Sequence, residues 1–138
     1  MKESLQEGLH YSYTYKVPEN KTVPELFPEA EEFQVMPKVF ATGYLVGLVE
    51  WTCIKALKEH LDWPKEQTVG IGATMTHQAA TPPGLIITVT VTLDKIDGKK
   101  LTFSFKANDS IDTITKGTHD RFIIDIDKFN ANLEKKMK

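Results

Sequence analysis

The sequence has one cysteine, almost no net charge and no long apolar run. Cys53 has no second cysteine for an intrachain disulfide, and no Cys/His ligand spacing accompanies it, so neither a disulfide scaffold nor a structural zinc site is supported. A net charge of -2 with short, mixed lysine clusters provides no basic footprint for nucleic acid. We therefore expect Cys53 to be a small buried side chain, and we expect no nucleic-acid partner.

The sequence also lacks a segment for crossing or entering a membrane. Residues 1–8 have no apolar stretch of the signal-peptide kind, and the longest apolar run, near residues 44–49, is too short to span a bilayer. We expect no membrane partner and a cytoplasmic location. With 138 residues, 41% of them hydrophobic and 26% charged, the chain predicts one domain over residues 1–138. Such a domain buries roughly 70% of its unfolded surface.

Alternating apolar and polar residues predict five strands. Residues 9–17 alternate with period two, which is the pattern of a half-buried strand. Further strands are predicted in four segments rich in Thr, Val, Ile and Phe, which cover residues 68–80, 85–96, 100–108 and 111–126. Asp97-Gly98 is a strong hairpin signal, and residues 108–110 form the next predicted turn.

A long helix is predicted over residues 42–61, where apolar residues recur at helical spacing. Because it is apolar around most of its circumference, we expect other elements to wrap it. Residues 127–138 predict a terminal amphipathic helix or a frayed tail. One strand, one long helix and four antiparallel strands describe an α+β domain of the hotdog fold, in which a curled sheet wraps the central helix.

Residues 18–40 separate the first strand from the helix and contain four of the seven prolines, so only short helical turns are expected there. The same segment carries too much apolar surface for a solvated linker, including Val23, Leu26, Phe33 and Met36. We therefore expect it to pack over another part of the molecule as a lid or rim.

Glu50 is the carboxylate of an otherwise apolar helix, and burying it costs several kcal/mol unless it is paired or hydrogen-bonded. It is therefore a functional candidate, although a structural acid bonded to a tyrosine or a backbone amide is the alternative. His77 lies near the end of the strand predicted over residues 68–80 and can exchange protons near pH 7, or it is simply a strand histidine whose ring is satisfied by hydrogen bonds. Thr42 stands where a helix N-cap is expected, so a capping role is the alternative to the favoured one, a group that positions and polarises the substrate.

His119 and Arg121 lie two residues apart on a predicted strand and so point to the same face. Arg121 could pair with Glu50, with another acid or with a coenzyme A phosphate.

Several motifs together resemble the fluoroacetyl-CoA thioesterase-like branch of the hotdog thioesterases over nearly the whole chain. They are Pro18 with Lys21-Thr22-Val23, residues 39–43, Val46-Gly47-Leu48 with Glu50-Trp51, Thr76-His77 with residues 79–84, Gly117-Thr118-His119 with Arg121, and Lys128-Phe129-Asn130.

The resemblance implies a hydrolytic constellation of Thr42, Glu50 and His77. It also implies a carbonyl-polarising backbone amide at Gly70, a site arginine at Arg121 and an apolar lid that includes Val23, Leu26 and Phe33. Where the fluoroacetyl-specific member has a phenylalanine gate, this chain has Met36, whose flexible thioether replaces a rigid ring. The resemblance therefore does not imply selection for a fluorinated acyl group. It does imply that the chain forms a homodimer.

The resemblance implies an acyl-CoA thioesterase that hydrolyses a short acyl group and needs no metal or redox cofactor, since coenzyme A is part of the substrate. Attack by water or by Glu50 is favoured over a threonine acyl-enzyme. The alternative is a non-catalytic domain that binds acyl-CoA or another small ligand. A hotdog hydratase has less support, because the chain lacks the Asp-x-Asn-Pro-x-His arrangement.

Overall fold

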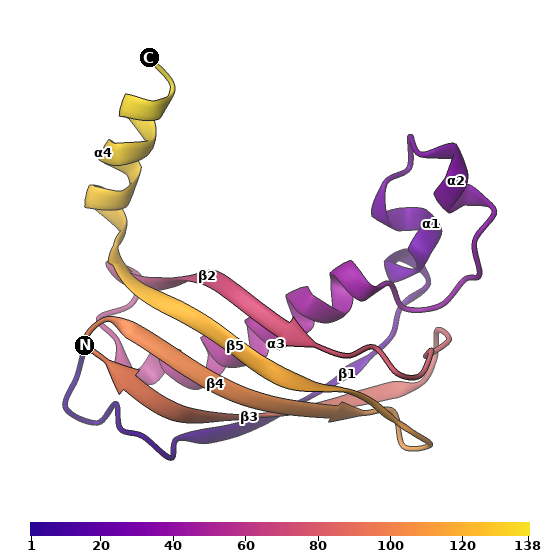
Figure 1. The fold of residues 1–138 in the computed structure, drawn as a ribbon, viewed down its shortest axis with the longest axis horizontal. Helices are drawn as coiled ribbons and strands as arrows, with labels where there is room; N and C mark the ends of the chain where they lie inside the picture. Colours follow the sequence, from indigo (N-terminus) through magenta and orange to yellow (C-terminus); the bar gives the residue numbers. More distant parts are fainter.

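The computed structural model describes residues 1–138, and its main feature is one five-stranded antiparallel sheet (Figure 1). The strands follow the spatial order β1-β3-β4-β5-β2. Their bounds are β1 His10–Lys16, β2 Glu66–Met75, β3 Ile86–Asp97, β4 Lys100–Asn108 and β5 Thr113–Asp125. The five predicted strands and the antiparallel sheet are confirmed, with end points that shift by a few residues.

The predicted central helix is confirmed as α3, Thr42–Leu57, which runs along one face of the curled sheet (Figure 1). The chain continues as a single 3-10 turn, η2 Lys58–His60, so the α-helix is shorter than the predicted 42–61. Its side chains Leu45, Val49 and Cys53 are fully buried or nearly so against the sheet. Burial of Cys53 agrees with its prediction as a small core residue.

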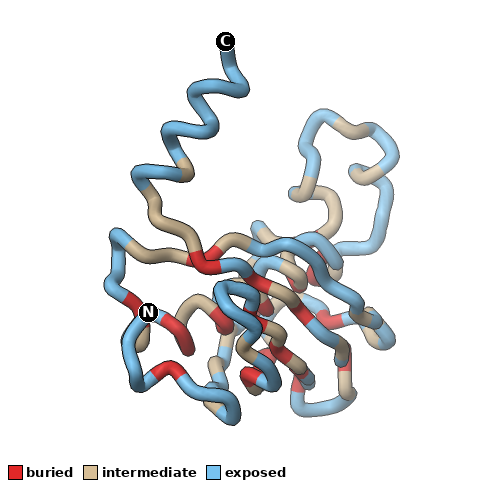
Figure 2. Tube along the Cα trace, turned by 60° about the vertical axis from the view of Figure 1, so that its left-hand side comes forward, coloured by how far each residue is buried: buried red, intermediate tan, exposed pale blue.

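The core lies between α3 and the inner face of the sheet and contains 20 buried apolar residues (Figure 2). Strand β3 supplies Ile87, Val89, Val91 and Leu93, all with no exposed surface. These are the alternate positions of the cleanest period-two segment, so strand pleating accounts for their common face.

One face of α3 is not covered within the single chain. Gly43, Gly47 and Trp51 are exposed along it, although the apolar sequence led us to expect a wrapped helix. The sheet covers only one side of the helix, because a five-stranded sheet curls around part of a cylinder rather than all of it.

Two arms project from this body on the same side (Figures 1 and 2). The first is the lid segment, residues 18–40, which contains only short helical turns as predicted. These are η1 Glu19–Lys21, α1 Val23–Leu26 and α2 Glu31–Gln34. The second is the C-terminal arm, residues 126–138, where the predicted helix forms as α4 Ile126–Lys136. None of the helices has the length and apolar character needed to cross a membrane.

Candidate active site

Thr42 and His77 are brought together by the fold. The Thr42 Oγ1 atom lies 2.7 Å from His77 Nδ1, across 35 residues of sequence. Thr42 is the first residue of α3, and the N-cap position is Ala41, so the alternative of a capping role for Thr42 is wrong. Its hydroxyl is committed to His77 instead, because it already lies inside the first helical turn.

The chain segments on either side of this pair are tied to each other. The Phe40 amide donates to the Thr81 carbonyl at 2.8 Å. The Thr81 hydroxyl in turn donates to Asp109 Oδ2 at 2.8 Å in a buried contact. The turn that contains Pro82 and Pro83 is therefore anchored to both the lid segment and the sheet. This anchoring holds the start of α3 beside His77.

The other ring nitrogen of His77 has no partner. Nε2 is shielded from solvent and makes no hydrogen bond within the chain. Burial lowers the pKa of His77 below its usual value, because desolvation disfavours the imidazolium form. An unpartnered buried nitrogen on a neutral imidazole can take or give a proton to a group that enters the site.

Glu50 pairs with Arg121 rather than with His77. Arg121 Nη1 donates to Glu50 Oε2 at 2.7 Å. The Glu50 side chain is 38% exposed, and its Oε1 atom makes no hydrogen bond within the chain. One carboxylate oxygen is therefore fixed, and the other is open to a water molecule or a substrate.

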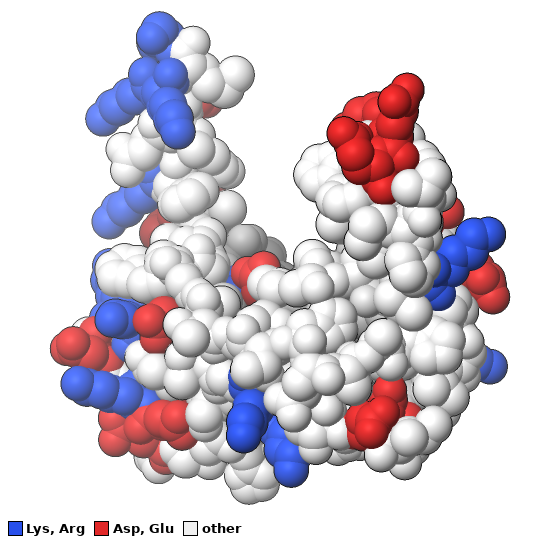
Figure 3. All heavy atoms as spheres, turned by 45° about the vertical axis from the view of Figure 1, so that its right-hand side comes forward, with Lys and Arg blue, Asp and Glu red and all other residues white.

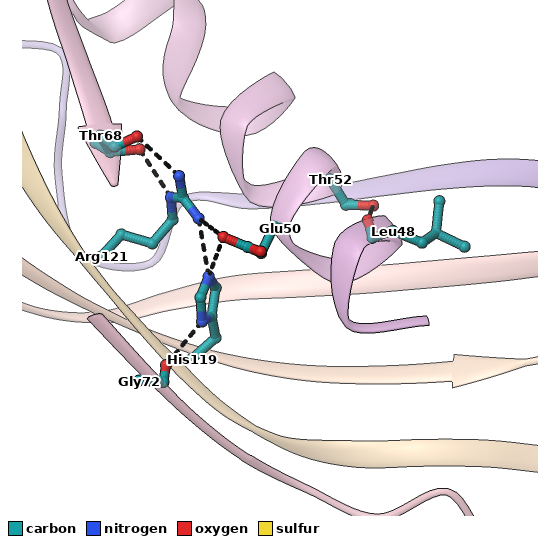
Figure 4. A network of polar contacts seen from close by, with 7 residues as sticks. All are labelled: Leu48, Glu50, Thr52, Thr68, Gly72, His119 and Arg121. Carbon is teal, nitrogen blue, oxygen red and sulfur yellow. Dashed lines mark hydrogen bonds and ion pairs between the residues drawn. The ribbon is translucent and has the colours of Figure 1, made fainter. Parts of the chain in front are cut away.

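Arg121 is itself held by several contacts (Figure 4). Nε donates to Thr68 Oγ1 and Nη2 donates to the Thr68 carbonyl, both at 2.8 Å. The guanidinium is almost fully buried, so its orientation is set by strand β2 rather than by solvent. Of the pairings left open for Arg121, the structure selects Glu50.

His119 completes this group. Its Nδ1 atom lies 2.8 Å from the Gly72 carbonyl oxygen, which can only accept, so Nδ1 carries the hydrogen. Nε2 then accepts from Arg121 Nη1 at 3.0 Å. Burial, with a smaller contribution from the Arg121 charge, lowers the pKa of His119 and keeps the ring neutral. The expected common face of His119 and Arg121 is confirmed.

Gly70 lies directly beneath the Glu50 carboxylate. A Cβ atom at this position would lie 2.6 Å from Glu50 Oε2 and 3.3 Å from Arg121 Nη1. Gly70 pairs with Arg121 across the β2–β5 ladder, next to a β-bulge at Ile71. The absence of a side chain therefore lets the carboxylate approach the strand, next to the backbone that the resemblance implies as a donor.

Within one chain, the Thr42–His77 pair and the Glu50–Arg121–His119 group are separate. Thr42 and Glu50 are eight residues apart on one straight helix, a rise of about 12 Å. The cavity beside Thr42 and His77, of about 300 Å³, is lined by both of them and not by Glu50. The structure thus divides the expected constellation into two clusters along α3.

The expected lid residues take different positions. Val23 lines the Thr42–His77 cavity, and Leu26 packs against Gly43 at the start of α3. Phe33 stacks on Phe27, with ring centroids 5.9 Å apart, at the outer part of the lid segment. Met36 is 45% exposed and does not line this cavity. Only the inner part of the lid segment therefore faces the cavity in this structure.

Comparison with known proteins decides the family. A sequence profile of the fluoroacetyl-CoA-specific thioesterase family matches residues 22–127. The chain belongs to this family. It is 43% identical to the fluoroacetyl-CoA thioesterase of Streptantibioticus cattleyicolor over 136 residues, which cover 99% of this chain and 97% of that one. The predicted activity class, thioester hydrolase, is confirmed by this relationship.

Solved structures of related proteins have the same fold as this chain. A structure of a fluoroacetyl-CoA thioesterase superposes with a TM-score of 0.94 at 42% identity, covering 97% of this chain and 98% of that chain. A thioesterase superfamily member from Thermus thermophilus superposes with a TM-score of 0.83 at 23% identity, covering 96% and 93%. A hot-dog-like protein from Thermanaerovibrio acidaminovorans superposes with a TM-score of 0.81 at 19% identity, covering 97% of this chain and 94% of that chain. These two distant structures extend only the fold comparison, and they confirm the predicted hotdog architecture.

Sequence reasoning missed the residues that support Arg121 and His119, which are Thr68 and Gly72 respectively. Thr68 and Gly72 carried no signal, because a threonine and a glycine in a strand have ordinary structural explanations. His119 was noticed only for sharing a face with Arg121. The alternation of His119 and Arg121, two polar residues at consecutive inward positions of a central strand, is the signal that could have identified the network.

Proposed function

We propose that this thioester hydrolase acts on the acyl-CoA thioester of a short acyl group, acetyl or a substituted acetyl, and releases the free acid and coenzyme A. The main support is the pair of polar clusters along α3. One contains His77, whose Nε2 atom has no hydrogen-bond partner, and the other contains Glu50, whose Oε1 atom is open. The fluoroacetyl-CoA thioesterase relative supports the substrate class. The modest cavity beside Thr42, about 300 Å³ in volume, suits a small acyl group.

In the proposed reaction, Glu50 and His77 perform the proton transfers. Arg121 holds Glu50 by Oε2, so that Oε1 can orient and deprotonate an attacking water. His77, neutral at the start, accepts on Nε2 the proton that Glu50 takes from the water and passes it to the departing thiolate, while Nδ1 stays hydrogen-bonded to the Thr42 hydroxyl. The Gly70 amide and the amides at the start of α3 stabilise the oxyanion that develops on the thioester carbonyl. The reaction uses no metal ion and no redox cofactor.

The proposal requires a second copy of the chain. Because Thr42 and Glu50 are about 12 Å apart along one helix, one protomer cannot bring both to the same small acyl group. Strand β2 is an edge strand with Ile71 exposed, so it can pair with a second β2 in antiparallel fashion. Pairing centred near residues 73 and 74 would set Gly70 opposite the partner's His77. A homodimer therefore joins the two clusters into one site at each end of the shared strand pair.

The experiment that tests the activity measures release of free thiol from a panel of acyl-CoA thioesters. The panel runs from acetyl and fluoroacetyl through propionyl, butyryl and benzoyl to long-chain forms. We expect turnover with the short members, reduced at least a hundredfold in Glu50→Gln. Glu59→Gln, an exposed position beyond the end of α3, is the matched control and should retain activity. If the folded wild-type protein hydrolyses no member of the panel, the result would instead favour a non-catalytic domain that binds acyl-CoA or another small ligand.

The two-chain site has its own test. Thr42→Ala and Glu50→Gln variants, each inactive alone, are mixed under conditions that exchange protomers. If each site takes Thr42 from one chain and Glu50 from the other, the mixed dimer regains one intact site and activity returns in part. No recovery in a mixture shown to exchange would count against the shared site.

The proposed reaction takes place in the cytoplasm and needs no metal ion. Dialysis of the enzyme against a chelator should therefore leave turnover unchanged.

A further inference from the structure

The two arms of the molecule stand at opposite ends of edge strand β2 (Figure 1). The C-terminal arm begins beside the start of β2, where Lys65 Nζ lies 3.2 Å from Asp125 Oδ2 and 3.1 Å from Asp127 Oδ2. The lid segment lies near the other end, because it leads into Thr42, which contacts His77 just beyond β2. The ten residues of β2 separate the two arms by about 30 Å.

Beyond its first turn, the C-terminal arm is unsupported within its own chain, because residues 130–138 are all exposed. Helix α4 has 11 residues and none of them is buried. An isolated helix shorter than about 12–15 residues is marginal in water, so another surface is needed to stabilise it. Phe129, Leu133 and Met137 follow one another at intervals of four residues and form an apolar stripe, which ends in a Met137 that is 87% exposed.

The tips of the two arms carry opposite charges. The end of α4 holds Lys135, Lys136 and Lys138, and the tip of the lid segment holds Glu29, Glu31 and Glu32. None of these six residues forms an ion pair within the chain. Figure 3 shows the two groups at the ends of separate projections with a wide notch between them. The apolar residues Phe27 and Val35 are exposed beside the acidic tip.

We propose that the C-terminal arm of each protomer docks on the lid segment of its partner in a homodimer. This inference rests on the homodimer of the proposed function. The two-fold axis beside residues 73 and 74 of β2 sets the two strands antiparallel, so the partner's lid segment lies at the end of β2 where the C-terminal arm begins. The lysine tip then meets the glutamate tip, and the apolar stripe of α4 covers the exposed apolar residues of the lid.

Docking of the arm affects substrate binding, because the lid segment leads directly to the cavity that contains Val23, Thr42 and His77. The partner's arm holds the lid segment in one position above that cavity. Loss of the arm therefore weakens binding of the acyl-CoA substrate, which raises KM, while the groups that transfer protons are untouched. The expected signature is a change in KM with kcat nearly constant.

Disulfide cross-linking between two differently tagged chains tests the contact. One chain carries Glu32→Cys and the other carries Lys135→Cys, and the buried Cys53 does not interfere. We expect a disulfide that joins the two tags. A matched pair of Lys16→Cys with Lys135→Cys should not cross-link, since Lys16 lies on β1 at the opposite edge of the sheet. If no cross-link forms, sedimentation velocity shows whether the protein is a dimer or a monomer. A dimer without the cross-link overturns the docking alone, and a monomer overturns the dimer as well.

Charge exchange provides a second readout. Reversing Lys135 and Lys136 to glutamate, or Glu31 and Glu32 to lysine, should raise KM about threefold to tenfold, because exposed ion pairs contribute modestly. Combining the two double variants restores the attraction and should return KM toward the wild-type value. A combined variant that is no better than either double variant would overturn the proposed pairing of these tips.

Discussion

The Glu50 carboxylate lies so close to the backbone of Gly70 that no side chain larger than that of glycine fits at position 70. A Cβ atom built on Gly70 would lie 2.6 Å from Glu50 Oε2, well inside van der Waals contact. The two residues come from different elements, β2 and α3, and Arg121 on β5 fixes the carboxylate between them. The position of the carboxylate therefore depends on a missing side chain as much as on its hydrogen bond.

Replacing Gly70 should disturb catalysis more than folding. In Gly70→Ala the new methyl group displaces the Glu50 carboxylate, and we expect kcat/KM to fall by about tenfold to a hundredfold, because small misplacements of a catalytic group are costly. Thiol release under steady-state conditions measures the change.

Gly72→Ala is the matched control for this prediction. It lies two residues away in the same strand, and a Cβ atom there meets no other atom within 4 Å. Its activity should stay close to that of the wild type. Equal losses in both variants would mean that the strand, and not the carboxylate, is responsible.

The activity should depend on a neutral His77. Burial lowers the pKa of His77 in the folded protein, so the ring stays neutral at pH 7 and becomes protonated only below its ordinary value near 6.5. We expect kcat/KM to be constant near neutrality and to fall at acidic pH, with a midpoint below 6.5. A midpoint above 6.5 in a pH–rate profile would contradict the role of His77.

Stability should show a related dependence on pH. The pKa values of His77 and His119 are both lowered by burial, so below about 6.5 the unfolded chain binds protons that the folded chain does not. The free energy of unfolding therefore decreases as the pH falls below about 6.5 and increases as it rises again. Urea unfolding at several pH values measures the slope. His119→Gln should make that slope shallower, and an unchanged slope would exclude His119 as a contributor.

The residue at position 36 should control discrimination between acyl groups. Met36 stands at the position of the phenylalanine gate that the resemblance implies, and its flexible, exposed side chain does not line the Thr42–His77 cavity, so it provides no rigid surface there. We expect Met36→Phe to raise the ratio of kcat/KM for fluoroacetyl-CoA to that for acetyl-CoA. Val35→Phe adds the same ring at a neighbouring position that is 88% exposed, and it should leave the ratio unchanged. An equal ratio in wild type and Met36→Phe would contradict the prediction.

Cys53 should be inert in the folded enzyme. It has no exposed surface, and burial raises its pKa to about 12, so almost none of it is a reactive thiolate at neutral pH. A thiol-reactive dye should show no reaction with the native protein and one thiol per chain after denaturation. Rapid labelling of native protein would show that α3 opens readily.

Much of the fold could be predicted because it depends on local patterns. Strand β4 was expected at residues 100–108 and forms at Lys100–Asn108, since alternation and the flanking turns are sufficient to define it. The start of α3 at Thr42 was also predicted, because the apolar spacing begins there. The resemblance to a family supplied Thr42, Glu50 and His77 as candidates, but not their arrangement.

The pairing within the site could not be predicted. Glu50 and Arg121 are 71 residues apart, and their contact requires Arg121 to lie opposite Gly70 in the β2–β5 ladder. The contact of Thr42 likewise depends on a histidine from a distant turn, and only the structure excludes the alternative of a helix cap. Strand register and the path of a turn set these contacts, and neither is encoded in local spacing.

By itself, the sequence determined the five strands, the central helix and the apolar face on which they meet, because periodicity and turn residues act over short distances along the chain. The tertiary structure decided that Glu50 joins Arg121 and His119 while Thr42 joins His77. It also decided that the two arms flank the open edge of the sheet. These relationships depend on the rise of a rigid helix and on the register of antiparallel strands, which together place residues that the chain keeps far apart.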